Sequence, residues 1–233
     1  MATLSAVITG GTKGIGLALV QRFAAAGFQV LTCARSLVGF EAIQTQYPSG
    51  QIKALATDMS KPEEVAAFAA FVLAEVGNPS VLINNTGVFL PGTILGEPAG
   101  NLELMINTNV YSAYHLTRAL VPAMLTAGSG HIFNICSTAS LVAYPNGGSY
   151  CISKFALLGM TKVLREELKT SGLRVTAVMP GATLTSSWDG VDLPEDRFMP
   201  PADVAELIWQ VYSLSPLTVV EELVLRPQLG DIS

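Results

Sequence analysis

The apolar positions of this chain follow two alternating patterns. Short apolar runs, typical of buried parallel strands, occur at residues 4–9, 28–33, 52–57, 81–84, 131–135, 173–179 and 219–225. Between them the apolar residues keep helical spacing, which predicts helices at 15–26, 41–47, 102–126, 150–169 and 201–212, and another that begins after Ser60. Strands that alternate with helices throughout predict a parallel sheet covered by helices on both faces. No linker interrupts the alternation, so we expect one α/β domain over residues 1–233.

The ends of the predicted helices carry capping signals. Gly27 follows the first helix in the position of a C-terminal cap, and Ser60 precedes Pro62 in the position of an N-terminal cap. Glu63 occupies the third position after Ser60, which predicts a capping box between the two side chains.

The composition narrows the class of protein. The chain has 233 residues, a net charge of −5, 50% hydrophobic residues and a mean hydropathy of +0.45. The sequence has no basic cluster and no apolar run of the length that spans a bilayer, so we expect neither nucleic acid nor a membrane as partner. Its first residues lack a signal-peptide pattern, which predicts a cytoplasmic protein. Cys33, Cys136 and Cys151 show no metal-ligand spacing, so we expect three buried thiols and no metal site.

A glycine-rich segment, GGTKGIG at residues 10–16, joins the first predicted strand to the first predicted helix. Glycines in this place permit a tight turn and let a pyrophosphate approach the backbone at a helix N-terminus. The position between a strand and a helix favours a dinucleotide site. The alternative is a glycine loop that only closes the crossover between two strands.

A candidate for acid–base chemistry lies where the fifth predicted strand gives way to a loop and a helix. Tyr150 and Lys154 are four residues apart at the start of that helix, so their side chains share one face. An ammonium beside a phenol favours the phenolate, as a general acid and base for a carbonyl and alcohol pair requires. Ser137, at the end of the strand, could hydrogen-bond the same carbonyl oxygen. Taken alone, the same residues also fit a surface tyrosine, a solvated lysine and a turn serine.

The order and spacing of several segments together resemble the short-chain dehydrogenase/reductase family over nearly the whole chain. The matching segments are TGGTKGIG at 9–16, Asp58, NNTG at 84–87, Asn109, Ser137, Tyr150 with Lys154, and Pro180-Gly181 followed by Thr183 and Thr185. Thr86 departs from the pattern, because the family usually has alanine there. The resemblance implies a doubly wound Rossmann domain with a seven-stranded, mainly parallel sheet in the order 3-2-1-4-5-6-7 and a substrate loop at about 182–200.

The resemblance also implies a catalytic set of four residues. Tyr150 would give a proton to the carbonyl oxygen as hydride arrives from the nicotinamide, and Ser137 would orient and polarise that carbonyl. Lys154 would favour the phenolate and hold the nicotinamide ribose. Asn109 would anchor a water that relays protons to the lysine. In such enzymes the cofactor supplies the hydride, and the protein supplies orientation and electrostatics.

The cofactor contacts implied by the resemblance come from separate segments. The glycine turn would hold the diphosphate, Asp58 would contact the adenine, the NNTG segment would line the cleft, and two threonines would hold the carboxamide. The full implied set is Gly10, Thr12, Lys13, Gly14, Ile15, Gly16, Arg35, Asp58, Asn85, Gly87, Tyr150, Lys154, Pro180, Gly181, Thr183 and Thr185.

The end of the second strand indicates which cofactor is preferred. NAD sites place an acidic residue there for the adenosine ribose hydroxyls, but this chain has Ala34. Arg35 follows, and Lys13 lies in the glycine turn, so two cations are available to a 2′-phosphate. We therefore expect NADP (NADPH), with NAD less favoured. The alternative is that Arg35 only ends a strand in water and Lys13 points away, which would give dual specificity.

Two functions remain open from the sequence. The favoured one is an NADP-dependent short-chain dehydrogenase/reductase (EC 1.1.1.-) acting on a small, apolar carbonyl or alcohol; the other is a catalytically silent nucleotide-binding or scaffold protein of the same fold. The presence of Ser137, Tyr150 and Lys154 together favours the enzyme. Small and apolar residues on the helices at 102–126 and 150–169 predict a homo-oligomer, a dimer or more favourably a tetramer. His115 and His131 are expected to be structural.

Overall fold

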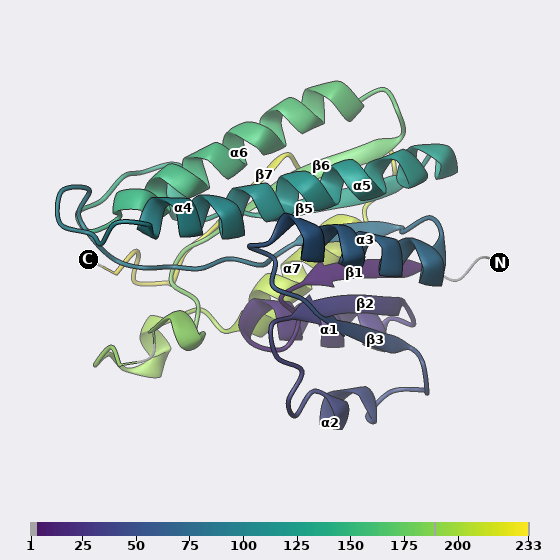
Figure 1. The fold of residues 1–233 in the computed structure, drawn as a ribbon, viewed down its shortest axis with the longest axis horizontal. Helices are drawn as coiled ribbons and strands as arrows, with labels where there is room; N and C mark the ends of the chain where they lie inside the picture. The colour runs from purple at the N-terminus through teal and green to yellow at the C-terminus, as the bar shows by residue number, and fades with distance from the viewer. Residues whose placement is uncertain (1–3, 189, 233) are drawn as a thin grey trace.

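A seven-stranded parallel sheet runs through the centre of the computed structural model, which describes residues 4–188 and 190–232 (Figure 1). The strands lie in the order β3-β2-β1-β4-β5-β6-β7, and every neighbouring pair is parallel. Their bounds are Ser5–Thr9 (β1), Gln29–Ala34 (β2), Ile52–Ala56 (β3), Val81–Asn84 (β4), Gly130–Ile135 (β5), Leu173–Pro180 (β6) and Glu222–Leu225 (β7). The predicted strands, their order and their parallel pairing are confirmed.

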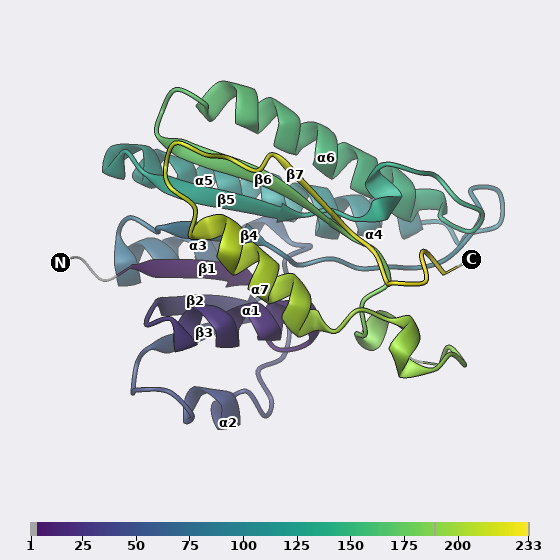
Figure 2. The same cartoon turned by 180° about the vertical axis from the view of Figure 1, so that it is seen from behind.

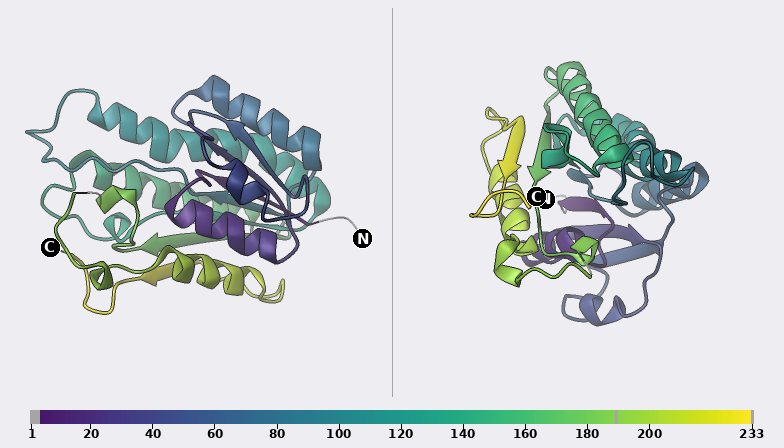
Figure 3. Two further views of the ribbon diagram at one scale, coloured as in Figure 1. Left: turned by 90° about the horizontal axis from the view of Figure 1, so that it is seen from below. Right: turned by 90° about the vertical axis from the view of Figure 1, so that its left-hand side faces the viewer.

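Two helical layers cover the sheet, as Figures 1 and 2 show from its two sides. One layer holds α3, α5 and α6, and the other holds α1 and α7; the end-on view of Figure 3 shows the sheet between them. The helices are Gly14–Ala25 (α1), Glu41–Gln44 (α2), Pro62–Val76 (α3), Asn101–Ile106 (α4), Ser112–Ala127 (α5), Gly148–Leu168 (α6) and Pro201–Tyr212 (α7). Short 3₁₀ helices occur at Thr138–Ser140, Ser186–Trp188 and Glu195–Arg197. No helix within the described ranges is long and apolar enough to cross a membrane.

Strand β1 explains why the sheet needs helices on both faces. All five of its residues are buried, and their side chains alternate between the two layers. Ala6 and Ile8 pack with Phe23 of α1, whereas Val7 packs with Phe68 of α3. Because such a strand is buried on both faces, its sequence is a nearly continuous apolar run.

The predicted helix at 102–126 is interrupted in the structure. Residues Asn107–Tyr111 form a π-helical turn between α4 and α5. A π-helical turn holds one extra residue and rotates the side chains that follow it, which is why such turns are common at functional sites. Apolar periodicity alone did not reveal the insertion.

The predicted capping box at the start of α3 is wrong. Lys61 is the N-cap, and the Ser60 hydroxyl donates to Asp58 Oδ1 at 2.8 Å. Glu64, one residue beyond the predicted partner, accepts the backbone N–H of Asp58 at 2.6 Å. The Glu64 carboxylate therefore holds the loop after β3. The chain turns before α3 begins, so Glu64 and not Glu63 reaches that loop.

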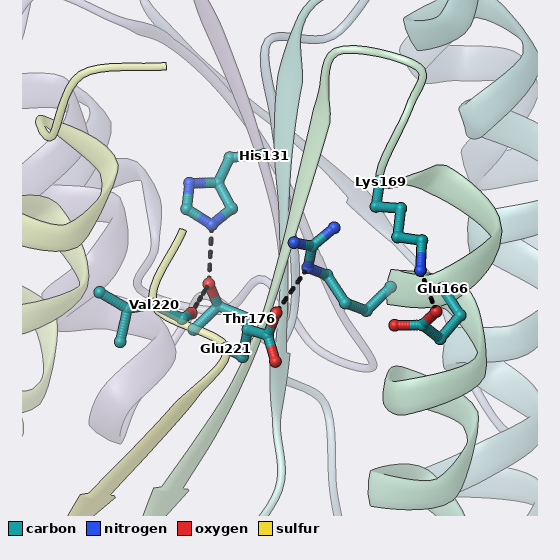
Figure 4. A network of polar contacts seen from close by, with 7 residues as sticks. His131, Glu166, Lys169, Thr176, Val220 and Glu221 are labelled. Carbon is teal, nitrogen blue, oxygen red and sulfur yellow. Dashed lines mark hydrogen bonds and ion pairs between the residues drawn. The ribbon is translucent and has the colours of Figure 1, made fainter. Parts of the chain in front are cut away.

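The β5–β6–β7 side of the sheet is held by a buried polar relay (Figure 4). The Thr176 hydroxyl donates to the carbonyl oxygen of Val220 at 2.6 Å, so it accepts from Nε2 of His131, 2.8 Å away. Burial, with the charge of Arg174, lowers the pKa of His131 to about 2, which keeps the ring neutral. His131 is thus structural, as expected, and the relay ties β7 to the strands beside it.

The strand order predicts a ligand crevice at the edge of the sheet where the carboxyl ends of the strands meet. The connections reverse direction between β1 and β4, and parallel α/β sheets bind ligands outside the carboxyl ends of the strands at such a point. The loops after β1, β4, β5 and β6 all leave this edge.

Candidate active site

The glycine turn after β1 forms one wall of the crevice. Gly10 and Gly14 have φ angles of 71° and 54°, which favour glycine over any other residue. A Cβ on Gly16 would lie 2.1 Å from the carbonyl oxygen of Gly10, so the first turn of α1 approaches the loop too closely for a side chain. The start of α1 has no side-chain cap, and the N–H groups of a helix N-terminus suit a pyrophosphate.

The segment after β4 is hydrogen-bonded to the end of β1. The Thr9 hydroxyl accepts the backbone N–H groups of Asn85 and Thr86, each at 2.9 Å. Asn85 Nδ2 donates in turn to the carbonyl oxygen of Thr9 at 2.8 Å. These bonds hold the NNTG segment beside the glycine turn, so the two predicted cofactor segments share one wall.

Thr86 is the residue that departs from the family pattern. Its Oγ1 is buried and has no hydrogen-bond partner among the residues that the structure describes. A Cβ on Gly10 would lie 3.1 Å from this oxygen, so the hydroxyl is pressed against the turn. Burial of a hydroxyl without a partner destabilises a protein by about 1–3 kcal/mol.

The segment after β6 returns to the glycine turn. Pro180 ends β6, and the N–H of Gly181 donates to the carbonyl oxygen of Leu225 at 2.8 Å. Thr183 pairs with Met199 and is buried. A Cβ on Gly14 would lie 3.0 Å from Cγ2 of Thr185, so that threonine packs directly on the turn. Within the predicted substrate loop at 182–200, Asp189 lies outside the described residues.

Arg35 lies close enough to Asp58, the acid predicted to meet the adenine, for its charge to act on that carboxylate. Arg35 and Lys13 are both exposed. Burial alone would raise the pKa of Asp58, but hydrogen bonds from Ser60 and the charges of Lys61 and Arg35 lower it below its usual value. Asp58 is therefore a carboxylate that feels the charge of Arg35 at the ends of β2 and β3.

Ser137 follows β5 and caps the 3₁₀ turn Thr138–Ser140. Its Oγ accepts the N–H of Ala139 at 3.1 Å, and Ser140 Oγ accepts the N–H of Ser137 at 3.2 Å. This capping box fixes the side chain, and the hydroxyl proton stays available to an acceptor in the crevice. A carbonyl oxygen is such an acceptor.

Lys154 reaches back from α6 to the end of β5. Its side chain is 4% exposed, and Nζ donates to the carbonyl oxygen of Ile135 at 2.9 Å. Residues 4–188 and 190–232 provide it with no ion pair. A buried ammonium needs further acceptors, and Nζ lies 5.7 Å from the ring centroid of Tyr150. The Tyr150 ring packs edge-on against Phe89, with centroids 4.8 Å apart.

Asn109 sits in the π-helical turn and is 1% exposed. Its Oδ1 accepts the N–H of Val88 at 2.7 Å, and its Nδ2 donates to the carbonyl oxygen of Val88 at 3.0 Å. The same Nδ2 donates to Ser153 Oγ at 2.9 Å. A Cβ on Gly87 would lie 3.4 Å from Asn109 Oδ1 and 3.6 Å from Lys154 Nζ, so both groups face that glycine.

Ser153 was not singled out from the sequence. It is fully buried and joins two predicted catalytic residues, because its hydroxyl accepts from Asn109 and donates to the carbonyl oxygen of Tyr150 at 2.8 Å. One sequence feature could have indicated Ser153: it directly precedes Lys154, which places it beside the face of α6 that carries Tyr150 and Lys154.

Known proteins are similar to this chain in sequence and in fold. A family model for short chain dehydrogenases matches residues 5–195. A sepiapterin reductase from Chlorobaculum tepidum is 32% identical over 236 residues, which cover 97% of each chain. A D-beta-hydroxybutyrate dehydrogenase from Rhizobium meliloti is 36% identical over 192 residues, covering 78% of this chain and 72% of that enzyme.

Solved structures give the same result. A metagenomic short-chain oxidoreductase in complex with NADP has a TM-score of 0.85 at 31% identity and covers 98% of this chain and 99% of its own. An alcohol dehydrogenase from Thermococcus sibiricus, complexed with 5-hydroxy-NADP, has a TM-score of 0.91 at 25% identity, with 99% of each chain covered. The chain belongs to the short chain dehydrogenase family, a family of oxidoreductases.

Proposed function

We propose that this protein is an NADP(H)-dependent oxidoreductase that interconverts a small, apolar carbonyl compound and its alcohol. The observation that carries the proposal is the buried Lys154 ammonium, held on the end of β5 beside Tyr150 with no carboxylate partner in the described chain. An ammonium so placed can stabilise the negative charge that develops on a phenol during proton transfer and can donate hydrogen bonds to ribose hydroxyls. A silent binding protein has no need of this buried charge.

The proton chemistry follows from three side chains. Ser137 donates a hydrogen bond to the substrate carbonyl oxygen, keeps its proton and so polarises the C=O bond. NADPH, when bound, would supply the hydride for the carbonyl carbon. Tyr150 transfers its proton to the carbonyl oxygen, so the products are an alcohol, NADP⁺ and a tyrosinate that Lys154 stabilises. Asn109 holds a water that returns a proton towards Lys154 and Tyr150. Support for this role comes from Asn109 Oδ1 and Lys154 Nζ, which both face Gly87.

The residues around the crevice fit NADP(H). The close backbone approach at Gly16 holds the N-terminus of α1 against the glycine turn, where its N–H groups suit the diphosphate. Thr12, Ile15, Asn85 and Gly87 line the walls, and Pro180, Gly181, Thr183 and Thr185 bound the nicotinamide end. Arg35, assisted by Lys13, binds the 2′-phosphate, and Ala34 provides no carboxylate to repel it. Asp58 meets the adenine.

The test of the cofactor preference is a titration of the protein with NADPH and with NADH, followed by fluorescence. Charge-assisted bonds contribute about 1.5–3 kcal/mol each, so we expect NADPH to bind about ten-fold to several-hundred-fold more tightly. Arg35→Ala should remove most of that advantage and leave NADH affinity unchanged. Equal dissociation constants for the two cofactors, or full NADPH affinity in Arg35→Ala, would refute the preference.

Apolar side chains support the proposed substrate class. Phe89 packs on Tyr150, and Leu141 and Leu184 are partly exposed on the loops at the same edge of the sheet. The test is a panel of aliphatic ketones, aromatic aldehydes and phenanthrenequinone, with NADPH oxidation followed by absorbance. Turnover of apolar carbonyls supports the assignment, whereas tight NADPH binding with no turnover on any of them would favour the silent binding protein.

The proposal extends to assembly and location. The protein is a homo-oligomer, in its favoured form a homotetramer, in the cytoplasm, with the whole chain as one catalytic domain and 182–200 as the substrate loop. Support for assembly comes from exposed apolar side chains on or beside α5 and α6, namely Tyr111, Tyr114, Leu125, Ile152, Phe155 and Val163. Light scattering that gave a mass near 24.5 kDa at micromolar concentration would contradict the oligomer.

A further inference from the structure

The helix that carries Tyr150 and Lys154 has no cap of its own. Its N-cap is Gly147, which has no side chain, and no acidic residue occurs in its first turn. The first N–H groups of a helix need acceptors, and a carboxylate near them is favourable. The start of α6 therefore depends on a group from elsewhere in the chain.

Glu97 supplies that group from the loop between β4 and α4. The hydroxyl of Ser149 donates to Glu97 Oε1, and the backbone N–H of Ser149 lies 3.4 Å from Oε2. Ser149 is 1% exposed and Glu97 is half-buried, so the contact is partly shielded from solvent. Local sequence could not show the pair, because 52 residues separate the two partners.

The loop that carries Glu97 is itself packed against the start of α6. The N–H of Gly92 donates to the carbonyl oxygen of Asn146 at 2.9 Å, and the N–H of Glu97 donates to the carbonyl oxygen of Thr93 at 2.9 Å. A Cβ on Gly148 would lie 2.5 Å from the carbonyl oxygen of Gly92. The loop and the helix start thus meet backbone to backbone, with Glu97 directed at Ser149.

A second bond of the same kind lies one helical turn further on. Ser149 precedes Tyr150 and is held by Glu97, while Ser153 precedes Lys154 and is held by Asn109. We propose that Glu97 is a positioning residue that acts through Ser149 to hold the Tyr150 hydroxyl in line with Lys154 and Ser137. This inference rests on the proposed reductase function. It also links the Phe89 wall of the substrate site, on the same loop, to the catalytic helix.

Loss of the hydrogen bond between Glu97 and Ser149 should lower kcat more than it weakens NADPH binding. A displacement of about 1 Å in a reacting group costs up to about 10²-fold in rate. For Glu97→Ala we therefore expect kcat with phenanthrenequinone and NADPH to fall about 10- to 100-fold, with KM for NADPH changed by less than about three-fold. Glu97→Gln keeps an oxygen for the Ser149 hydroxyl and should recover most of the rate. Glu103→Ala, on exposed α4 nearby, is the matched control and should retain wild-type kcat.

The same variants in a Tyr150→Phe background separate positioning from general damage. If Glu97 acts through Tyr150, Glu97→Ala should not lower the residual rate of Tyr150→Phe further. Ser149→Ala should lower kcat in the same direction, and the Glu97→Ala/Ser149→Ala pair should be no worse than Glu97→Ala. Ser149→Ala is the smaller change and carries the test if Glu97→Ala does not fold.

Three results would overturn the inference: wild-type kcat in Glu97→Ala, an equal loss in Glu103→Ala, or additive losses with Tyr150→Phe. Refutation of the Glu97 inference can be distinguished from refutation of the proposed reductase function. A wild-type protein that turns over no carbonyl compound refutes the function and the inference with it, whereas an active wild type with an equally active Glu97→Ala refutes the inference alone.

Discussion

The glycine turn and the catalytic helix lie at the same edge of the sheet, but different atoms fix them. In the turn, Gly16 and Gly10 meet backbone to backbone, and the absence of side chains creates the site. Around α6, polar side chains reach across the fold: Lys154 to Ile135, Asn109 to Val88 and Ser153, and Glu97 to Ser149.

Substitutions in the two regions should therefore have different effects. Close backbone approach tolerates no added atom, so substitutions in the turn should act on folding and cofactor binding together. Side-chain bonds can be removed one at a time, so substitutions around α6 should change the rate while the fold and the cofactor site persist.

The largest effect is expected from Tyr150→Phe. General acid–base catalysis contributes about 10²–10⁴-fold, so kcat should fall by about that factor while NADPH affinity stays within about two-fold. Lys154→Ala should lower both, because the ammonium is also proposed to hold the nicotinamide ribose. The measurement is steady-state turnover of an active carbonyl compound beside an NADPH titration. A Tyr150→Phe protein with most of the wild-type rate would contradict the assignment of the proton donor.

Gly16→Ala should break the turn. The new Cβ would lie 2.1 Å from the Gly10 carbonyl oxygen and 2.6 Å from Asn85 Nδ2, which forces the first turn of α1 away from the loop. We expect a destabilised protein, by about 2 kcal/mol or more, and NADPH affinity at least about ten-fold weaker. Thermal unfolding and NADPH titration measure the two effects. Normal NADPH binding in this variant would show that the close approach is not needed.

Removal of the Thr9 and Thr86 hydroxyls, both in the proposed cofactor site, should change stability in opposite directions. Thr9→Val removes the acceptor of two backbone N–H groups and should lower the free energy of unfolding by about 2 kcal/mol. Thr86→Val removes a buried hydroxyl that has no partner among the described residues and should raise it by up to about 1 kcal/mol. Urea denaturation of both variants is the measurement. Destabilisation of similar size in both would mean that the Thr86 hydroxyl is satisfied in solution.

The smallest effect is expected from Gly159→Ala on the outer face of α6. An added Cβ there meets no atom within 4 Å, and the glycine is exposed in mid-helix. The change should raise the free energy of unfolding by about 0.5–1 kcal/mol through helix propensity, with kcat and NADPH affinity unchanged. It is also the matched glycine control for Gly16→Ala, with light scattering to check the oligomer, because Gly159 lies between Phe155 and Val163 on the proposed oligomer face. A loss of activity with the oligomer intact would show that the outer face of α6 also affects the site.

Much of the fold could be predicted from short-range patterns. The strands were found because buried parallel strands are continuous apolar runs, and β1 is buried at all five positions. The glycine turn was found because its residues are consecutive. The π-helical turn at Asn107–Tyr111 was not predicted, because one extra residue per turn leaves the local composition unchanged. The capping box at Ser60 was wrong for a similar reason, since the direction of the chain decides which glutamate reaches the loop.

The sequence by itself determined the order of strands and helices, the glycine turn and the residue types available for proton transfer, because each depends on neighbours in the chain. The tertiary structure alone decided which of those residues meet. Thr185 packs on Gly14, Ser153 joins Asn109 to the catalytic helix, and Glu97 caps that helix from a separate loop. These contacts depend on how parallel strands bring their carboxyl ends to one edge, and a hydrogen bond forms only where folding places donor and acceptor within about 3 Å.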